Sequence, residues 1–141
     1  MAKTIDMQLM RYINLFEKLS NVSTTNCFVY NNTIIFAVPK NKLSRAIGKS
    51  GVNMKRLSAT FRKKVKTIEM PEEDTDNQIE KFVSDVVSPV EFSKMEFEDG
   101  GAVIKAGRQS KAALIGRNKA RVEELEEILK RFFNIPKVRI A

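Results

Sequence analysis

The 141-residue sequence contains no histidine and only one cysteine, Cys27. Without histidine it lacks the commonest general base and a frequent metal ligand, and Ser44, Ser50 and Ser110 have no imidazole to activate them. We therefore expect no enzyme activity, no cofactor and no metal site. A single cysteine also excludes a disulfide framework, so we expect a reducing, cytoplasmic setting with Cys27 as a buried thiol in a strand.

Long hydrophobic runs are also absent. No apolar run approaches the ~20 residues of a membrane span, and the N-terminal residues 1–6 lack the apolar core of a signal peptide. We therefore expect no membrane partner. The hydrophobic content of 43% is still enough for a packed core, and the length suits one ordinary domain or two small ones.

Acidic residues are scarce in the first half of the chain. Residues 1–70 contain 13 Lys/Arg and 3 Asp/Glu, a net charge of +10, whereas residues 71–141 contain 12 and 14, a net charge of −2. The sum is +8, and the isoelectric point of about 9.7 indicates a polyanionic partner. The second half still has six basic residues and no acid between positions 105 and 121, and its acids gather at 71–80, 91–99 and 123–127.

The chain is organised around residues 43–57, which predict a short helix, a Gly-Lys-Ser-Gly turn and a second helix. Gly48 and Gly51 remove two side chains where the chain turns sharply, so a ligand can approach the backbone closely. The turn ends at a helix start, where free N–H groups and the helix dipole favour a phosphate. Five basic residues surround it with no acid between them: Lys42, Arg45, Lys49, Lys55 and Arg56.

The elements predicted around this turn run helix, strand, strand, helix, helix, strand. Asn31-Asn32 is a plausible two-residue hairpin turn, because asparagine tolerates positive φ. The predicted ranges are Thr4–Leu19 with Ile5 inward and Asp6 in the first turn, Thr25–Tyr30, Thr33–Val38, Lys40–Ile47, Val52–Arg62 and Lys64–Met70.

The same order begins again after the polar, acidic stretch Pro71–Asp76. At an offset of 68 residues, Ile47-Gly48 falls on Ile115-Gly116, and Leu57 falls on Leu125. Two copies of one small unit explain this register better than one domain does. The ranges predicted for the second copy are Asn77–Val87, Val90–Glu98, Ala102–Ala106, Gln109–Ile115, Ala120–Phe132 and Lys137–Ile140.

Ile47-Gly48-Lys49-Ser50-Gly51 between two short helices resembles the GXXG loop of a KH domain, a small module that binds RNA or single-stranded DNA. A helix and a strand ahead of the core resemble the type II topology. The tandem pair is similar to the compact, archaeal-type NusA-like transcription factors. The resemblance implies an α+β fold with two tandem type II KH domains, each with a three-stranded sheet packed on helices: residues 1–70, a linker at 71–76, and residues 77–141.

The family likeness implies a function in transcription termination or antitermination through single-stranded RNA. It assigns phosphate and sugar contacts to the first loop, an apolar groove to Ile47 and Val52, and flanking positions to Lys64 and Lys66. The predicted RNA-binding residues of the first copy are Lys42, Arg45, Ile47, Gly48, Lys49, Ser50, Gly51, Val52, Lys55, Arg56, Lys64 and Lys66.

The second copy departs from the family pattern, because Lys119 stands where the second glycine belongs. Asn118 can adopt a left-handed conformation, so the turn is feasible, and we expect this copy to hold RNA less closely or to rely on side-chain charge. Its predicted RNA-binding residues are Arg108, Lys111, Ile115, Gly116, Arg117, Asn118, Lys119 and Arg121.

Other interpretations of these residues stay open. The two turns are also consistent with plain helix connectors, scattered lysines with a solvated face, and Ile47, Ile115 and Val52 with core positions. A nucleotide-binding P-loop is excluded, because position 43 is leucine rather than glycine. A monomeric adaptor that binds RNA polymerase or ribosome-associated proteins, with RNA contact secondary, is the alternative function. The acids at 123–127 fit either an outer helix face or a contact with a basic partner.

Overall fold

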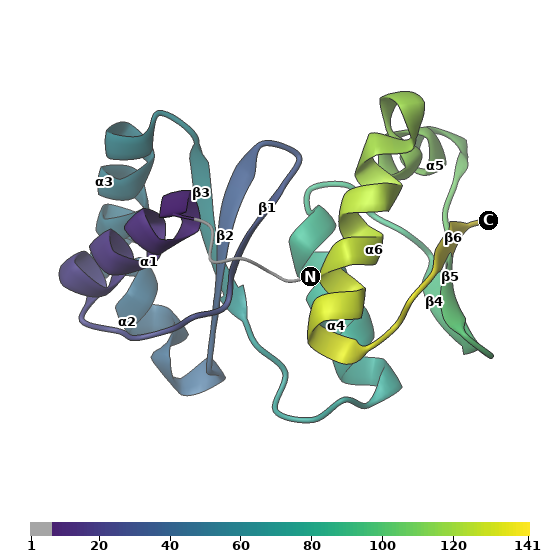
Figure 1. Ribbon diagram of the computed structural model, residues 1–141, viewed down its shortest axis with the longest axis horizontal. Coiled ribbons are helices and arrows are strands. Elements are labelled where there is room, and N and C mark those ends of the chain that lie inside the picture. The colour runs from purple at the N-terminus through teal and green to yellow at the C-terminus, as the bar shows by residue number, and fades with distance from the viewer. Residues whose placement is uncertain (1–6) are drawn as a thin grey trace. The chain divides into compact units, whose positions relative to one another are not determined.

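The computed structural model describes residues 7–141, which divide into two compact units with the boundary between Met70 and Pro71. Each unit repeats the same order of helix, strand, strand, helix, helix and strand (Figure 1). Over the described residues the chain has six α-helices and two three-stranded sheets. The expected α+β class is therefore confirmed.

In the first unit, helices cover one face of a mixed sheet. Strand β1 pairs antiparallel with the central strand β2, and β2 pairs parallel with β3. Asn31 and Asn32 both have positive φ, 50° and 60°, as a two-residue hairpin turn requires. The elements are α1 (Met7–Ser20), β1 (Cys27–Tyr30), β2 (Thr33–Val38), α2 (Leu43–Ile47), α3 (Val52–Phe61) and β3 (Lys64–Glu69).

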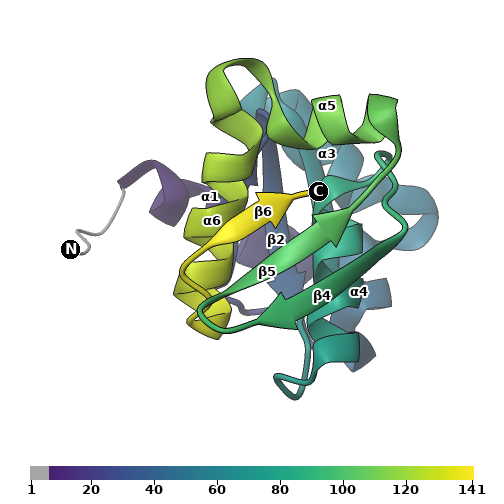
Figure 2. The same ribbon diagram turned by 90° about the vertical axis from the view of Figure 1, so that its right-hand side faces the viewer.

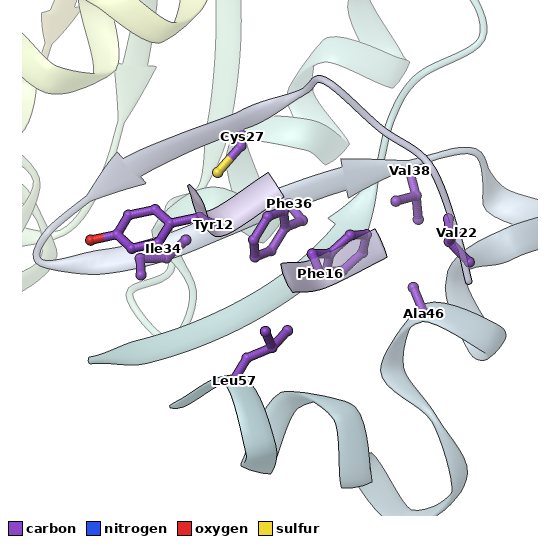
Figure 3. Close-up of a cluster of buried hydrophobic side chains, with 9 residues drawn as sticks. All are labelled: Tyr12, Phe16, Val22, Cys27, Ile34, Phe36, Val38, Ala46 and Leu57. Atoms are coloured by element: carbon purple, nitrogen blue, oxygen red, sulfur yellow. The ribbon is translucent and has the colours of Figure 1, made fainter. Parts of the chain in front are cut away.

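The first core lies between this sheet and helices α1, α2 and α3 (Figure 3). Phe16 of α1 stacks on Phe36 of β2 with ring centroids 4.1 Å apart, and Tyr12 packs against Phe61 of α3 at 4.5 Å. Cys27 is fully buried here, as expected from the sequence. Burial of these apolar side chains fixes α2 and α3, and with them the loop that joins the two helices.

The second unit has the same topology in its own residues. Strand β4 pairs antiparallel with β5, and β5 pairs parallel with β6. Helices α4 and α6 lie behind one face of this sheet in the view of Figure 2. The elements are α4 (Asp76–Val87), β4 (Lys94–Glu98), β5 (Gly101–Lys105), α5 (Arg108–Ile115), α6 (Ala120–Phe133) and β6 (Val138–Ile140).

Polar side chains order the ends of the second unit. Thr75 caps α4 by accepting a hydrogen bond from the Gln78 N–H, and the Gln78 side-chain oxygen accepts from the N–H groups of Glu72 and Glu73. The acidic stretch that the sequence suggested as a linker is therefore held against the start of α4. At the other end, the Glu126 carboxylate accepts from the Val138 N–H at 3.0 Å and ties α6 to β6.

Several predicted boundaries were wrong. Strand β4 begins at Lys94 rather than Val90, because the chain first turns at Val87–Val90, where the Val90 N–H bonds the Val87 carbonyl. The helix expected over Lys40–Ile47 starts as a 3₁₀ turn at Lys40–Lys42. The predicted start of the first helix, including Ile5 and Asp6, lies outside the described residues.

Candidate nucleic-acid interface

The first loop leaves α2 at Gly48 and enters α3 at Val52. Gly48 lies at φ 83° and ψ 165°, Ser50 at φ 55° and Gly51 at φ 72°. The Gly48 N–H donates to the Ser44 carbonyl and the Gly51 N–H donates to the Gly48 carbonyl, each at 3.0 Å. The loop therefore folds back on itself and is continuous with the last turn of α2.

The two glycines of this loop are required for different reasons. A Cβ at Gly48 would lie 2.9 Å from Val52 Cγ1 and 3.0 Å from the Asn53 side chain, whereas a Cβ at Gly51 would have nothing within 4 Å. Both residues have positive φ, which L side chains adopt at a cost. Gly48 is thus fixed by sterics and conformation together, and Gly51 by conformation alone.

The second loop follows the same backbone path. Gly116 matches Gly48, Asn118 matches Ser50 at the same φ of 55°, and Lys119 at φ 63° and ψ 20° matches Gly51 at φ 72° and ψ 22°. The predicted left-handed conformation of Asn118 is confirmed. The open space beside Gly51 explains why a lysine is accommodated at the equivalent position, where it keeps only the conformational cost of positive φ.

Most predicted residues of the first loop are exposed together. Lys42, Arg45, Lys49, Lys55 and Arg56 all have exposed side chains, and the sequence from 40 to 68 contains no acid. Beside them Val52 is 38% exposed, a high value for a large apolar side chain, and Ile47 is half-buried. The structure therefore presents positive charge and a small apolar surface on either side of one glycine turn.

Lys64 and Lys66 do not join this exposed cluster. Helix α3 carries the chain away from Gly51 over ten residues, about 15 Å at 1.5 Å per residue, before Lys64 begins β3. Val65 packs on the core beneath the helices, so the alternating side chains of Lys64 and Lys66 point from the other face of the sheet. A function for these two lysines in RNA binding stays a prediction.

The predicted residues of the second loop are less uniform. Arg108, Lys111, Arg117, Asn118 and Lys119 are exposed, as the expectation requires, and Ile115 is half-buried. Arg121 is different, because its side chain covers Gly116 and its Nε lies 3.0 Å from the Glu124 Oε1. This arginine has a structural partner within its own helix.

The first turns of the two helices that follow the loops carry opposite charge. At the offset of 68 residues, Lys55 and Arg56 of α3 correspond to Glu123 and Glu124 of α6. Carboxylates at a helix N-terminus stabilise the helix, but they also repel a phosphate there. The acids continue along α6, where Glu123, Glu124, Glu126 and Glu127 line a hollow of about 530 Å³.

Asn53 is the residue at the first loop that the sequence interpretation missed. It is only 8% exposed, and its side-chain amide donates to the Ala46 carbonyl at 3.1 Å and lies 3.4 Å from the Arg45 carbonyl. A polar residue one position before Met54, on the inward side of an amphipathic helix, was the available signal.

Two further searches of residues 7–141 found no candidate of their kind. No helix in this part is long and apolar enough to cross a membrane. Within the same residues, no three His, Cys, Asp or Glu side chains gather as metal ligands would.

Comparison with known proteins agrees with this geometry. A family model described as KH domain matches residues 10–89, which contain the whole first loop. Probable transcription termination protein NusA from Methanocaldococcus jannaschii is 30% identical over 91% of this chain and 69% of its own length. The protein of the same name from Halococcus morrhuae is 24% identical over the full length of both chains. Among solved structures, the crystal structure of APE1850 is 26% identical with a TM-score of 0.63, over 97% of this chain and 100% of that one.

A glycine loop between two helices, on a sheet of this topology and within the matched residues, defines the first unit as a KH domain. KH domains are nucleic-acid-binding modules. With a relative 30% identical that it covers over two thirds, the chain belongs to the archaeal-type NusA-like family of RNA-binding KH proteins. The resemblance read from the sequence is therefore confirmed.

Proposed function

We propose that this protein binds single-stranded RNA through two GXXG-type loops and acts in transcription termination or antitermination. The exposed, acid-free cluster of basic residues at the first loop is the observation that carries the proposal. Phosphate contacts supply affinity and orientation, and contacts in the apolar groove beside Val52 supply sequence preference. No step of this function requires catalysis or a cofactor.

The proposal divides the chain into two KH domains, residues 1–70 and 77–141, joined by residues 71–76. The second domain is supported by its matched loop backbone and by its element order, which repeats that of the first unit. The KH family model ends at residue 89, before β4. Use of the second loop for RNA therefore rests on geometry alone, and the proposal assigns the main grip to the first loop.

The assignment to transcription comes from the relatives. Three archaeal proteins similar to this chain are named probable transcription termination protein NusA. An RNA-binding protein that acts at this step contacts the transcript, and RNA polymerase is the partner that such a function implies.

The test is RNA binding across a salt series. A labelled pool of short random-sequence single-stranded RNAs would be titrated with the intact protein and with the Lys49→Asp, Ser50→Asp double variant. We expect salt-dependent binding by the wild type, because lysine–phosphate contacts release counterions, and a large loss in the variant. Absence of wild-type binding at moderate salt, or a variant that binds as well as the wild type, would contradict the proposal.

An adaptor that binds a transcription or ribosome-associated protein is the second candidate. The acidic side of α6, with Glu123, Glu124, Glu126 and Glu127, favours it because such a surface suits a basic protein rather than RNA. Under this function, partner binding survives the double substitution in the first loop while RNA binding does not.

A further inference from the structure

Asn53 connects the helices on the two sides of the first loop. The last turn of α2 contains Arg45 and Ala46, whose carbonyls have no partner within so short a helix. The Asn53 Nδ2 donates to Ala46 at 3.1 Å and approaches Arg45 at 3.4 Å, although Asn53 itself belongs to α3. One buried side chain therefore satisfies the end of the helix before the loop from the helix after it.

The same side chain also packs against the first glycine of the loop. Asn53 Cγ and Nδ2 would each lie 3.0 Å from a Cβ built at Gly48, so the amide group fills the space that a side chain at position 48 would need. Gly48 lies at φ 83° and ψ 165° and begins the exposed residues Lys49 and Ser50. Asn53 thus fixes the point at which the loop leaves α2.

The second unit solves the same packing problem with different chemistry. Arg121 occupies the equivalent position, and its Cγ and backbone N would lie 2.6 Å and 2.8 Å from a Cβ at Gly116. Its Nε then pairs with Glu124 on the same helix. Cover over the first glycine is therefore common to both loops, whereas an amide that donates to the preceding helix is shown at the first.

We propose that Asn53 is a positioning residue for RNA, which holds the first loop in its binding conformation without touching the ligand. This inference rests on the proposed RNA-binding function. A loop that spends only part of its time in the binding conformation shows an affinity reduced by that fraction. The hydrogen bonds of Asn53 hold α2 against α3, so they keep the exposed side chain of Lys49 where the RNA backbone meets it.

The experiment removes the amide and keeps its volume. Asn53→Leu and the smaller Asn53→Ala are compared with Asn41→Leu, a control at an exposed asparagine of the 3₁₀ turn Lys40–Lys42. Binding to the random-sequence RNA pool and thermal unfolding are measured for each full-length variant. We expect both Asn53 variants to bind about fivefold more weakly while still folded, and the control to bind as the wild type does.

A double-mutant cycle with Lys49→Ala separates positioning from general stability. If Asn53 acts through the loop, the loss of affinity from Lys49→Ala is smaller in the Asn53→Leu or Asn53→Ala protein than in the wild type. Additive losses, unchanged affinity in both Asn53 variants, or unfolding of both would overturn the inference. Failure of the wild type to bind RNA would instead overturn the proposed function, so the two failures are distinguishable.

Discussion

The two loops of this protein share one backbone path and differ in the charges that surround it. Their matched φ and ψ angles differ by at most 9°, the difference between Gly51 at φ 72° and Lys119 at φ 63°. At the first loop every nearby ionisable side chain is basic, whereas the second loop leads directly into Glu123 and Glu124. Backbone geometry is therefore retained where the electrostatic surface has changed.

This difference teaches that a GXXG-like turn is a structural device first and a phosphate site second. Gly116 and its close cover by Arg121 are enough to produce the turn, even without the second glycine. Whether RNA binds there is decided by the side chains on the following helix. Each prediction below either removes this contrast between the loops or makes it larger.

The largest effect is expected from charge reversal in the loops. Lys49→Asp with Ser50→Asp should weaken RNA binding on the order of 100-fold at low salt and make the salt dependence shallower, because a phosphate contact becomes a repulsion. The matched pair Arg117→Asp with Asn118→Asp should cost less. Equal losses, or a greater loss at the second loop, measured by titration of the same RNA pool, would remove the contrast.

The first glycine of each loop should be equally indispensable. Gly48→Ala and Gly116→Ala should each lower the free energy of unfolding by about 3 kcal/mol, since each adds a Cβ within 3.0 Å of neighbouring atoms at positive φ. Gly51→Ala is the control, and it should cost only about 1 kcal/mol because open space surrounds it. Denaturant titration measures all three, and a Gly48→Ala protein as stable as Gly51→Ala would contradict the steric argument.

Restoring basic residues to α6 should bring the second loop closer to the first. Glu123→Lys with Glu124→Arg recreates Lys55 and Arg56, and we expect RNA affinity to rise about fivefold at low salt and little at high salt. Glu127→Lys, further along the helix, is the matched control for net charge. An equal gain from the control would show that overall charge, and not its place at the loop, determines binding.

A glycine at position 119 should relieve the strain of the second loop. Lys119→Gly is expected to raise the free energy of unfolding by about 0.5 kcal/mol, because a residue at φ 63° no longer carries a side chain. The reverse change, Gly51→Lys, should destabilise the first loop by a similar or larger amount. Thermal or denaturant unfolding tests both, and a destabilised Lys119→Gly protein would indicate that the lysine side chain makes stabilising contacts.

The smallest effect concerns the outer face of the second sheet. Hydrogen bonds from Lys94 and then Lys105, with Nζ–carboxylate distances of 3.0 and 3.1 Å, lower the pKa of Glu96 below its usual 4.5. A lowered folded-state pKa contributes stability that is present above the unfolded value and is lost as the pH falls through the folded one. We expect Glu96→Gln to abolish a slight acid-dependent loss of stability, and a carboxyl titration by NMR at or above 4.5 would contradict the assignment.

The fold could be predicted from the sequence because its signals are local and repeated. Asn31-Asn32, the inward face of α4 and the glycine turns each carry a strong pattern, and the offset of 68 residues makes one copy support the other. Strand β4 was placed too early because Val90 and Phe92 have strand propensity, and the turn that precedes the strand depends on a hydrogen bond to α4.

The candidate site was only partly predictable. The basic residues at the first loop follow from composition and spacing, but the side-chain direction of Lys66 depends on register within the sheet. The burial of Asn53 and the pairing of Arg121 with Glu124 are tertiary contacts, which periodicity does not show. Charge counted along the sequence also hid the reversal at Glu123, because the two helix starts are compared only when the units are superimposed.

The parallel pairing of β2 with β3 has a consequence for folding. The β1–β2 hairpin closes through the two residues Asn31 and Asn32, whereas β3 can join β2 only after α2, the loop and α3 have brought the chain back. Contacts between residues distant in the sequence form more slowly than local ones, since more chain entropy is lost before they form. A folding intermediate with the hairpin alone would therefore carry the basic residues without the RNA site, which appears only in the step that completes the sheet.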